Sequence, residues 1–385
     1  MTLLAAVGQS QALDGREAGL QAARQALNQL GNMPAALGVI AVSHQFEAQQ
    51  VISGIASLTG NLPLVGFSTS ECLTSGGLHR NSVTVALIGG GDIHADVHWL
   101  AGFSQGSREV IRELVGLLDQ HPERPALFFA DGFNTNVEQI CAGLPPAAFV
   151  AGGLSCGDLR TGHAYQIGGN SSGSGGMALA RLEGKVKMGI GFGHGWQPVG
   201  NAFQVTRSRG FWLRALDGRP ASETYAHLFG YPARDWAFPP LNHLVRLYPL
   251  GVVQAAENLL IRSPIRVEAD GSFRLNTPIN DGSDAYLLVG SMEACRQAVE
   301  QAARQALNAL EGIEPALALV LVDVAWRMLF EAQPGAEITA VQETLGKNVP
   351  VLGGYTLGQI VPGGGSNPPQ FLNQHLLIVV LGEAR

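Results

Sequence analysis

The sequence predicts an α/β protein with mixed sheets, built from repeated modules of a helix, a strand and a turn. The first observation behind this prediction is a turn motif that occurs three times, at residues 66–71, 153–158 and 354–359. Its template is Gly, a large apolar residue, a hydroxyl residue, any residue, Gly or Ser, and then an acid or its amide. Each copy follows a short apolar run, a pattern typical of a buried strand that ends in a glycine turn.

The second observation is a helix repeat upstream of the turns. The eight residues 21–28 recur letter for letter as residues 301–308. Both copies lead through a short loop into an apolar strand, at 35–42 and 316–322, and residues 110–130 show the same helix-then-strand pattern. Alanine-rich helices resemble one another by composition alone, but the same order of helix, strand and turn three times indicates internal repeats.

The spacing of the turns predicts how the modules follow one another. The interval between the second and third turns is more than twice the interval between the first and second. This predicts two modules in tandem and a third module that carries an insertion. We expect Gly66, Gly153 and Gly354 to occupy equivalent backbone positions at strand ends.

Apolar periodicity assigns the remaining elements. The predicted helices are residues 14–30, 46–58, 110–118 and 219–229. The predicted strands are residues 37–42, 82–88, 93–100, 126–130, 177–182, 186–192, 259–267, 272–275, 286–289 and 376–381. Strands 82–88 and 93–100 are expected to pair as a hairpin across a glycine loop, and strands 177–182 and 186–192 are expected to pair likewise.

Composition excludes several classes of protein. Hydrophobic residues are 46% of the 385 and charged residues 14%, which is typical of a folded chain with a large core. The net charge of −7 and the absence of Lys/Arg runs argue against a nucleic-acid binder and against an anionic membrane surface. Without an apolar run of about 18 residues, membrane insertion is not expected.

The cysteines and the N-terminus bear on location. Four cysteines lie far apart with no Cys-x-x-Cys pair, which is typical of reduced thiols. The first ten residues show no basic region and no cleavage-site pattern of a secretory signal. We therefore expect a cytoplasmic protein.

Two sequence patterns match known catalytic or metal-binding motifs but lack the structural context that those motifs require. Residues 153–157 match the Gly-x-Ser-x-Gly nucleophile elbow, but that motif must open a helix, and here a glycine-rich loop follows. His94, Asp96 and His98 alternate on one strand face, yet at about 3.3 Å per residue the two histidines lie about 13 Å apart, too far to share one metal ion. We expect neither a serine hydrolase nor a metal site.

The turns themselves are the candidate ligand site. Glycines allow close approach, hydroxyls donate or accept hydrogen bonds, and Glu71 and Asp158 could hold an ammonium group. Arg262 and Arg327, both beside apolar strands, could hold a carboxylate. The alternative is that these segments are only tight turns between sheet and helix. The candidate ligand-binding residues are Ser68, Thr69, Glu71, Ser155, Asp158, His194, Trp196, Arg262, Arg327, Tyr355, Thr356 and Asn373.

At these residues the chain resembles FIST-domain proteins, named for F-box and intracellular signal-transduction proteins. The motifs follow the family's order along nearly the whole chain: residues 65–69, 152–155, 195–200, 205–206, 216–221, 249–252, 262–264, 270–271, 349–356 and 373–374. The resemblance implies two FIST halves, an N-terminal domain of two modules at 1–210 and a C-terminal domain at 211–385.

The resemblance also implies a function. It implies an intracellular sensory protein that binds a small ligand, such as an amino acid, has no established enzyme chemistry, and signals through a separate partner. Some relatives are haem-containing nitric-oxide sensors that regulate a histidine kinase, and His194, His243 and His375 would be the candidate axial ligands. Ala325 stands where a cysteine often precedes Arg327, which argues against haem. A small-molecule enzyme that uses Ser155, Cys156 and His194 remains an alternative. The sequence names neither the ligand nor a cofactor.

Overall fold

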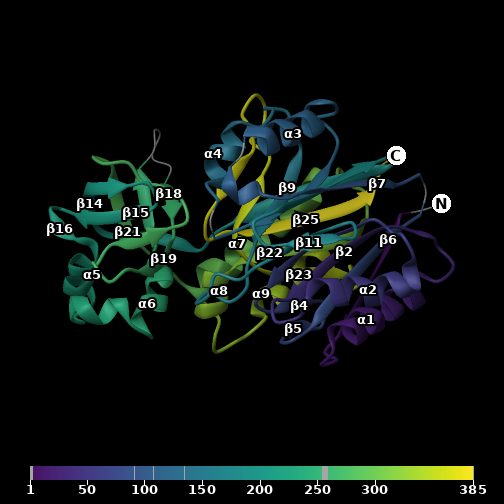
Figure 1. The fold of residues 1–385 in the computed structure, drawn as a ribbon, viewed down its shortest axis with the longest axis horizontal. Helices are drawn as coiled ribbons and strands as arrows, with labels where there is room; N and C mark the ends of the chain where they lie inside the picture. The colour runs from purple at the N-terminus through teal and green to yellow at the C-terminus, as the bar shows by residue number, and fades with distance from the viewer. Residues whose placement is uncertain (1–2, 91, 107, 134, 254–258, 385) are drawn as a thin grey trace. The chain divides into compact units, whose positions relative to one another are not determined.

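The computed structural model describes residues 3–90, 92–106, 108–133, 135–253 and 259–384 (Figure 1). The chain forms two compact units, one of residues 1–194 with 296–385 and one of residues 195–295. Helices alternate with strands, and the sheets are mixed, which confirms the predicted α/β class. None of the described helices is both long and apolar enough to cross a membrane.

The larger unit consists of three modules. Module 1 comprises β1 (Leu4–Ser10), α1 (Gly15–Leu30), β2 (Ala35–Ser43), α2 (Ala48–Thr59), β3 (Leu64–Thr69) and β6 (Val83–Gly89). Module 2 comprises β7 (His94–Leu100), α3 (Arg108–Asp119), β8 (Ala126–Asp131), α4 (Val137–Ala142), β9 (Val150–Ser155) and β12 (Met177–Glu183). Module 3 comprises β13 (Val186–Gly193), α7 (Met292–Ala309), β22 (Pro315–Asp323), α8 (Val324–Leu329), α9 (Ala336–Leu345), β23 (Val351–Val361) and β25 (Leu376–Glu383).

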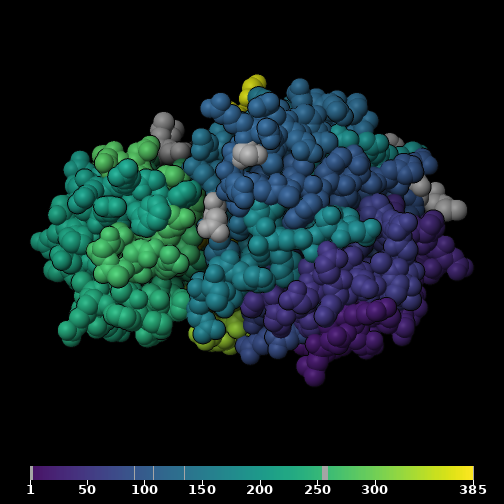
Figure 2. Space-filling model, viewed as in Figure 1, coloured from purple at the N-terminus to yellow at the C-terminus, as the bar shows by residue number. Residues whose placement is uncertain are grey.

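Short elements lie within these modules, between the helices and strands given above. They are β4 (Cys72–Thr74), β5 (Gly77–His79), η1 (Phe103–Gln105), β10 (Gln166–Gly168), β11 (Ser171–Gly173) and β24 (Gln370–Leu372). The helices α1 and α2 lie side by side over the sheet of module 1 (Figure 1) and form part of its surface (Figure 2).

All three modules have one strand order, which confirms the predicted repeat. The order is first, last, second, third: β1-β6-β2-β3, β7-β12-β8-β9 and β13-β25-β22-β23. The second and third strands are parallel in each module, and the last strand is antiparallel to both of its neighbours. A central core of apolar side chains from all three modules fills the space enclosed by these sheets.

The strand order shows that the hairpins predicted for strands 82–88 with 93–100 and for strands 177–182 with 186–192 are wrong. Strand β6 lies between β1 and β2, and strand β12 lies between β7 and β8, so both edges of each are already occupied. The strands β7 and β13 that follow them pair elsewhere, with β12 and β25. The glycine-rich links therefore lead from one module to the next and do not form hairpin turns.

The register of the parallel pairs identifies the equivalent glycines. The first residue pairs are Gly38–Leu64, Ala126–Val150 and Ala318–Val351. Counted from there, the third residues of β3, β9 and β23 are Gly66, Gly152 and Gly353. A Cβ atom at these glycines would lie 2.5, 1.7 and 2.1 Å from the carbonyl oxygen of the paired residue on the neighbouring strand. The same close approach therefore requires glycine in all three modules.

The predicted equivalence of Gly66, Gly153 and Gly354 is wrong by one residue in the second and third modules. Those modules have two adjacent glycines, at 152–153 and 353–354, whereas in module 1 the single glycine is followed by Phe67. The sequence motif aligned Gly66 with the second glycine of each pair. As a consequence, the acids that the motif placed together after the turns do not occupy equivalent positions.

The repeated octapeptide has a packing explanation. A Cβ atom at Gly8 of β1 would lie 2.0 Å from the carbonyl oxygen of Ala22, and one at Gly191 of β13 would lie 1.8 Å from that of Ala302. Helices α1 and α7 therefore lie so close to a strand that only glycine fits on the strand, and the helix residues in contact are alanines. Equivalent packing accounts for identical residues.

Each module is joined to another by the strand that follows its turn. Strand β4 of module 1 pairs with β23 of module 3, β10 of module 2 pairs with β3 of module 1, and the end of β23 pairs with β9 of module 2. The residues opposite the equivalent glycines are Leu73, Ile167 and Ile360. The three modules thus close a ring in which each one pairs with the next, an approximate threefold arrangement.

The smaller unit is the insertion in module 3, between β13 and α7. Its elements are β14 (Trp196–Arg209), β15 (Trp212–Leu216), β16 (Arg219–Pro220), α5 (Ala221–Phe229), η2 (Ala233–Ala237), α6 (Leu241–Leu244), η3 (Val245–Leu247), β17 (Leu250–Val253), β18 (Leu259–Arg262), β19 (Pro264–Val267), β20 (Phe273–Leu275) and β21 (Asp284–Gly290). It has its own core around Tyr225, Trp236 and Phe273. The compact units divide the chain at residues 194 and 295, whereas the domain boundary expected at residue 210, in the turn between β14 and β15, stays a prediction.

The close approach of the strands predicts a large effect of one methyl group. We expect Gly152→Ala to lower the free energy of unfolding by about 3 kcal/mol, since its Cβ would overlap a backbone oxygen that cannot move without shifting the sheet. The control is Gly116→Ala in the middle of α3, where a Cβ atom meets nothing within 4 Å; this variant should gain about 0.5–1 kcal/mol. Urea denaturation measures both, and equal effects would contradict the prediction.

Candidate functional site

A layer of buried polar side chains closes one end of the central core. Ser43, Asp131 and Asp323 end the second strands of the three modules, and their register partners Thr69, Ser155 and Thr356 lie on the third strands. All six are at most 4% exposed. The structure therefore brings the three predicted segments together at one place, and we call these six residues the polar layer. The prediction of a turn is wrong for the third segment, because residues 354–359 lie within the continuous strand β23.

The hydroxyl groups of the first turn hold the modules together. The Thr69 hydroxyl donates to the carbonyl oxygen of Tyr355 at 3.0 Å and accepts from its N–H at 2.7 Å. The Ser68 hydroxyl donates to the carbonyl oxygen of Cys156 at 2.9 Å and accepts from the N–H of Tyr165 at 2.9 Å. These groups are buried and satisfied by backbone atoms of neighbouring modules, so their role is structural.

The remaining hydroxyls lie deeper in the same layer. Thr356 Oγ1 donates to the carbonyl oxygen of Val322 at 3.3 Å and accepts from Gln359 Nε2 at 2.9 Å. Ser155 is fully buried, and its Oγ has no hydrogen-bond partner among the described residues. Strand β9 ends at Ser155 without opening a helix, and the chain continues through a loop to β10. Ser155 therefore lacks the turn and the adjacent base that a nucleophile needs.

Charged side chains from two modules meet beside this layer. Arg327 on α8 of module 3 donates through Nε to Glu71 Oε2 at 2.5 Å and through Nη2 to Oε1 at 3.2 Å. Arg80 Nε donates to Glu71 Oε1 at 3.1 Å. The side chains of Glu71, Arg327 and Arg80 are 12, 18 and 66% exposed. We call these three residues the charge cluster. The hydrogen bond that Arg327 donates to Glu71 raises the pKa of Arg327.

A second carboxylate lies behind the charge cluster. Tyr355 Oη donates to Glu337 Oε1 at 2.5 Å, and both side chains are buried. Burial raises the pKa of Glu337 above its ordinary value, and the hydrogen bond from Tyr355 and the positive charge of Arg327 oppose this only in part. Burial also raises the pKa of Tyr355. Tyr355 is thus fixed by an acid and has no exposed surface to offer a ligand.

A hollow of about 750 Å³ lies next to the charge cluster. It is formed between the β4–β5 hairpin of module 1 and the segment between α8 and α9 of module 3. Its lining residues are Gln11, Gly76, Gly77, Leu78, Arg80, Gln333, Pro334, Gly335, Ala336 and Thr339. We call it the Arg80 hollow, because Arg80 is the residue that belongs both to it and to the charge cluster.

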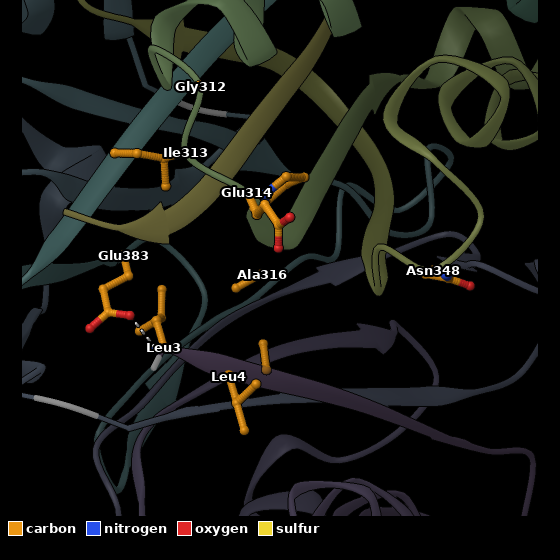
Figure 3. A pocket seen from close by; sticks show the side chains of 10 residues that line it. Leu3, Leu4, Gly312, Ile313, Glu314, Ala316, Asn348 and Glu383 are labelled. Carbon is orange, nitrogen blue, oxygen red and sulfur yellow. Dashed lines mark hydrogen bonds between the residues drawn. The ribbon is translucent and has the colours of Figure 1, made fainter. Parts of the chain in front are cut away.

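Two further hollows of about 580 Å³ each result from the repeat itself. One lies at the starts of β1 and β22, where Leu3 and Leu4 face Glu314 and Ala316 (Figure 3). The other lies at the starts of β7 and β2. In both, the first strand of one module begins beside the second strand of another, so the same hollow recurs at equivalent positions. We therefore attribute these two hollows to the packing of repeated modules and do not include them in the candidate site.

Comparison with known families decides the assignment. Residues 36–219 match the FIST N domain, and residues 221–362 match the FIST C domain. The chain belongs to the FIST family. FIST domains are associated with the sensing of small ligands and with signal transduction. No curated protein matches the chain.

Solved structures add nothing to the family assignment. The FIST chain is similar to Thermotoga maritima PurL complexed with ADP, at 13% identity and a TM-score of 0.24, over 99% of this chain and 72% of that one. It is similar to PurL complexed with ATP at 13% identity and a TM-score of 0.25, with the same coverage. Because both TM-scores are so low, this likeness supports no conclusion about the fold or the function of the chain.

The second turn of the FIST chain is self-contained. Asp158 accepts a hydrogen bond from the N–H of Arg160 at 2.9 Å, and this bond lowers the pKa of its carboxyl group. Its side chain is 26% exposed and lies 3.6 Å from the Arg160 guanidinium. Asp158 therefore stabilises its own loop, whereas Glu71 in the first turn reaches another module.

The histidines proposed for haem pack against each other. The rings of His194 and His375 are 4.7 Å apart between centroids, and His375 Nδ1 lies 2.6 Å from the carbonyl oxygen of Asn373, which is itself buried. Burial lowers the pKa of His375 to about 3. Neither ring lines any of the hollows described here. An axial ligand must face a space that a macrocycle can fill, and none of these hollows offers such a space to this pair. The third candidate, His243, lies on α6 of the inserted unit.

The other predicted residues lie outside this site or in the other unit. Asp96 accepts from His98 at 2.7 Å and from Arg181 at 2.9 Å, and no group of three potential metal ligands occurs in the described ranges. Trp196 and Arg262 are buried in the inserted unit, on β14 and β18. The sequence reasoning missed Arg80 and Glu337, because neither belongs to a repeated motif.

The raised pKa of Glu337 predicts a pH-dependent stability. The folded state binds this proton more tightly than the unfolded state, so the stabilisation is full below the unfolded-state pKa and is lost as the pH rises through the folded-state pKa. We expect Glu337→Gln to match the wild type at about pH 4 and to become progressively more stable than it as the pH is raised to neutrality. Urea denaturation across this range measures the difference.

The matched control is Glu343→Gln, an exposed glutamate on the same helix α9. Its difference from the wild type should stay constant over the same pH range. A Glu337→Gln difference that is equally constant would show that the buried carboxyl group does not titrate in this way.

Proposed function

We propose that the chain is a cytoplasmic sensory protein that binds a small zwitterionic ligand, such as an amino acid, in the Arg80 hollow. The observation that carries this proposal is the charge cluster, where Glu71 of module 1 meets Arg327 of module 3 and where Arg80, bonded to the same Glu71, lines the hollow. A zwitterion needs an acceptor for its ammonium group and a donor for its carboxylate. Glu71 and Arg80 supply these two groups side by side.

Exposure assigns the roles within the cluster. The Arg80 side chain is 66% exposed, and within the described residues it is paired only through Nε, so its terminal nitrogens can donate to a carboxylate. Glu71 is held by both arginines, which fixes its carboxylate for an incoming ammonium group. Arg327 is the positioning residue, because its fork orients Glu71 from the opposite module.

The position of the cluster supports a route for a signal. Glu71 and Arg327 join module 1 to module 3, and the ligand's ammonium group competes with Arg327 for the same carboxylate. A ligand that binds more tightly when this ion pair is loosened shifts the population of the two arrangements. A separate signalling protein, such as a histidine kinase, receives that change.

Buried thiols support a binding protein in the cytoplasm. All four cysteines are free and buried, as is typical of a reducing compartment. Cys156 and Ser155 have no exposed surface, so neither can reach a substrate in the Arg80 hollow. We propose binding without catalysis.

Titration of the full chain with the common amino acids tests the proposal. We expect at least one to bind and Arg80→Ala to weaken its binding about tenfold or more, the loss that one charge-assisted hydrogen bond produces. Because Arg80 is exposed, the melting temperature should stay within a few degrees. Isothermal titration calorimetry measures the affinity.

Two control variants sharpen the test. Arg24→Ala removes an exposed charge from α1, and Asp158→Asn alters the acid that caps its own loop. Both should bind as the wild type does. The proposal fails if no amino acid binds, or if Arg80→Ala binds as tightly as Arg24→Ala.

A further inference from the structure

The inserted unit contains a hollow of its own, of about 450 Å³. It lies where β14, β15 and the turn before β20 come together. Its lining residues are Thr206, Arg207, Arg214, Ala215, Gly218, Pro220, Asp270 and Ser272. We call it the arginine hollow. Its size suits a small ligand.

Two unpaired guanidinium groups line the arginine hollow. Arg207 on β14 is paired in register with Ala215, so Arg207 and Arg214 come from adjacent strands. Within the described part of the chain, neither arginine makes a hydrogen bond or a salt bridge, and Arg214 Nε is buried. Two like charges in one hollow repel each other, and a shared anion removes that repulsion.

The acid in the hollow offsets only one of the two arginine charges. Asp270 accepts hydrogen bonds from the N–H and the hydroxyl of Ser272, at 3.0 and 2.5 Å. These bonds lower the pKa of Asp270, and the nearby charge of Arg214 lowers it further. Asp270 is thus ionised and already satisfied, and two arginines face one aspartate. The lining keeps an excess of positive charge.

A hydroxyl group adds a further donor. Thr206 Oγ1 accepts a hydrogen bond from the N–H of Gly218 at 2.9 Å, which leaves its proton to donate. Gly218 follows Asp217 in a turn where both residues have positive φ, 49° and 77°. This left-handed pair fixes the backbone beside the two arginines.

We propose that the arginine hollow binds a small oxyanion, held by Arg207, Arg214 and the Thr206 hydroxyl. Guanidinium forks match the oxygen atoms of phosphate and carboxylate groups, and both groups share the chemistry recognised here. This site is independent of the proposed amino-acid site, because it belongs to the inserted unit and selects negative charge alone. Since the hollow is open to solvent, the affinity falls as salt is added.

Calorimetric titration of the full chain at low ionic strength with inorganic phosphate, and separately with acetate, tests this proposal. We expect phosphate to bind and Arg207→Ala to weaken that binding tenfold or more without changing the melting temperature, because Arg207 is exposed. Arg214→Lys keeps the charge but not the fork, and should weaken binding several-fold. Asp270→Asn removes the opposing charge, and should tighten binding several-fold.

The matched control is Arg234→Ala, which removes an exposed charge from η2 of the same unit and lies outside the hollow. It should bind phosphate as the wild type does. Binding of phosphate alone identifies a phosphate site, and binding of acetate as well identifies a general oxyanion site. The proposal is overturned if neither anion binds, if Arg207→Ala binds normally, or if Arg234→Ala loses as much affinity as Arg207→Ala.

Discussion

The close approach of two parallel strands at Gly66, Gly152 and Gly353 is the constraint on which the larger unit depends. At each point a carbonyl oxygen of the second strand occupies the space where a side chain of the third strand would lie. A strand of another module then pairs with this same glycine: β4 with Gly353, β10 with Gly66, and the end of β23 with Gly152. Because this happens three times in a ring, no module is complete without its neighbours.

The ring explains why polar and charged groups gather at one end. The second strands of all modules finish there, as do β3 and β9, whereas β23 continues to Val361. The chain of each module crosses to another module at this end, and the hydroxyls of the first turn satisfy backbone groups across the boundaries. The same crossing carries Glu71 to Arg327, two residues far apart in the sequence. In the proposed function, a ligand at this boundary would act on a contact between two modules, and through it on the arrangement of the ring.

The sequence reveals the modules because their packing demands particular residues. A glycine packed against a carbonyl oxygen recurs in all three modules, and an alanine packed against a strand glycine recurs in modules 1 and 3, so the helices, the strands and the insertion could be predicted. The turn was predicted correctly in two modules only, because in module 3 the same motif lies within β23. The register could not be predicted, since two adjacent glycines satisfy the motif equally well. The sequence predicted the site less well. It identified Glu71 and Arg327 as separate ligand contacts, because their pairing with each other depends on which modules are neighbours in the ring. Arg80 and Glu337 could not be identified from the sequence, because neither belongs to a repeated motif. The sequence also did not indicate that the hydroxyls of Ser68 and Thr69 bond backbone groups of other modules.

Residues 1–194 and 296–385 form a complete ring, into which residues 195–295 are inserted. The ends of the insertion already meet, since a Cβ atom at Gly195 would lie 2.4 Å from the backbone nitrogen of Cys295. The most direct measurement is urea denaturation, followed by circular dichroism, of a variant in which a short glycine–serine linker replaces residues 195–295. If the ring is complete without the insertion, this variant unfolds in a single cooperative transition and has native helix and strand content. A variant that stays unfolded, or that unfolds gradually without a transition, would contradict it.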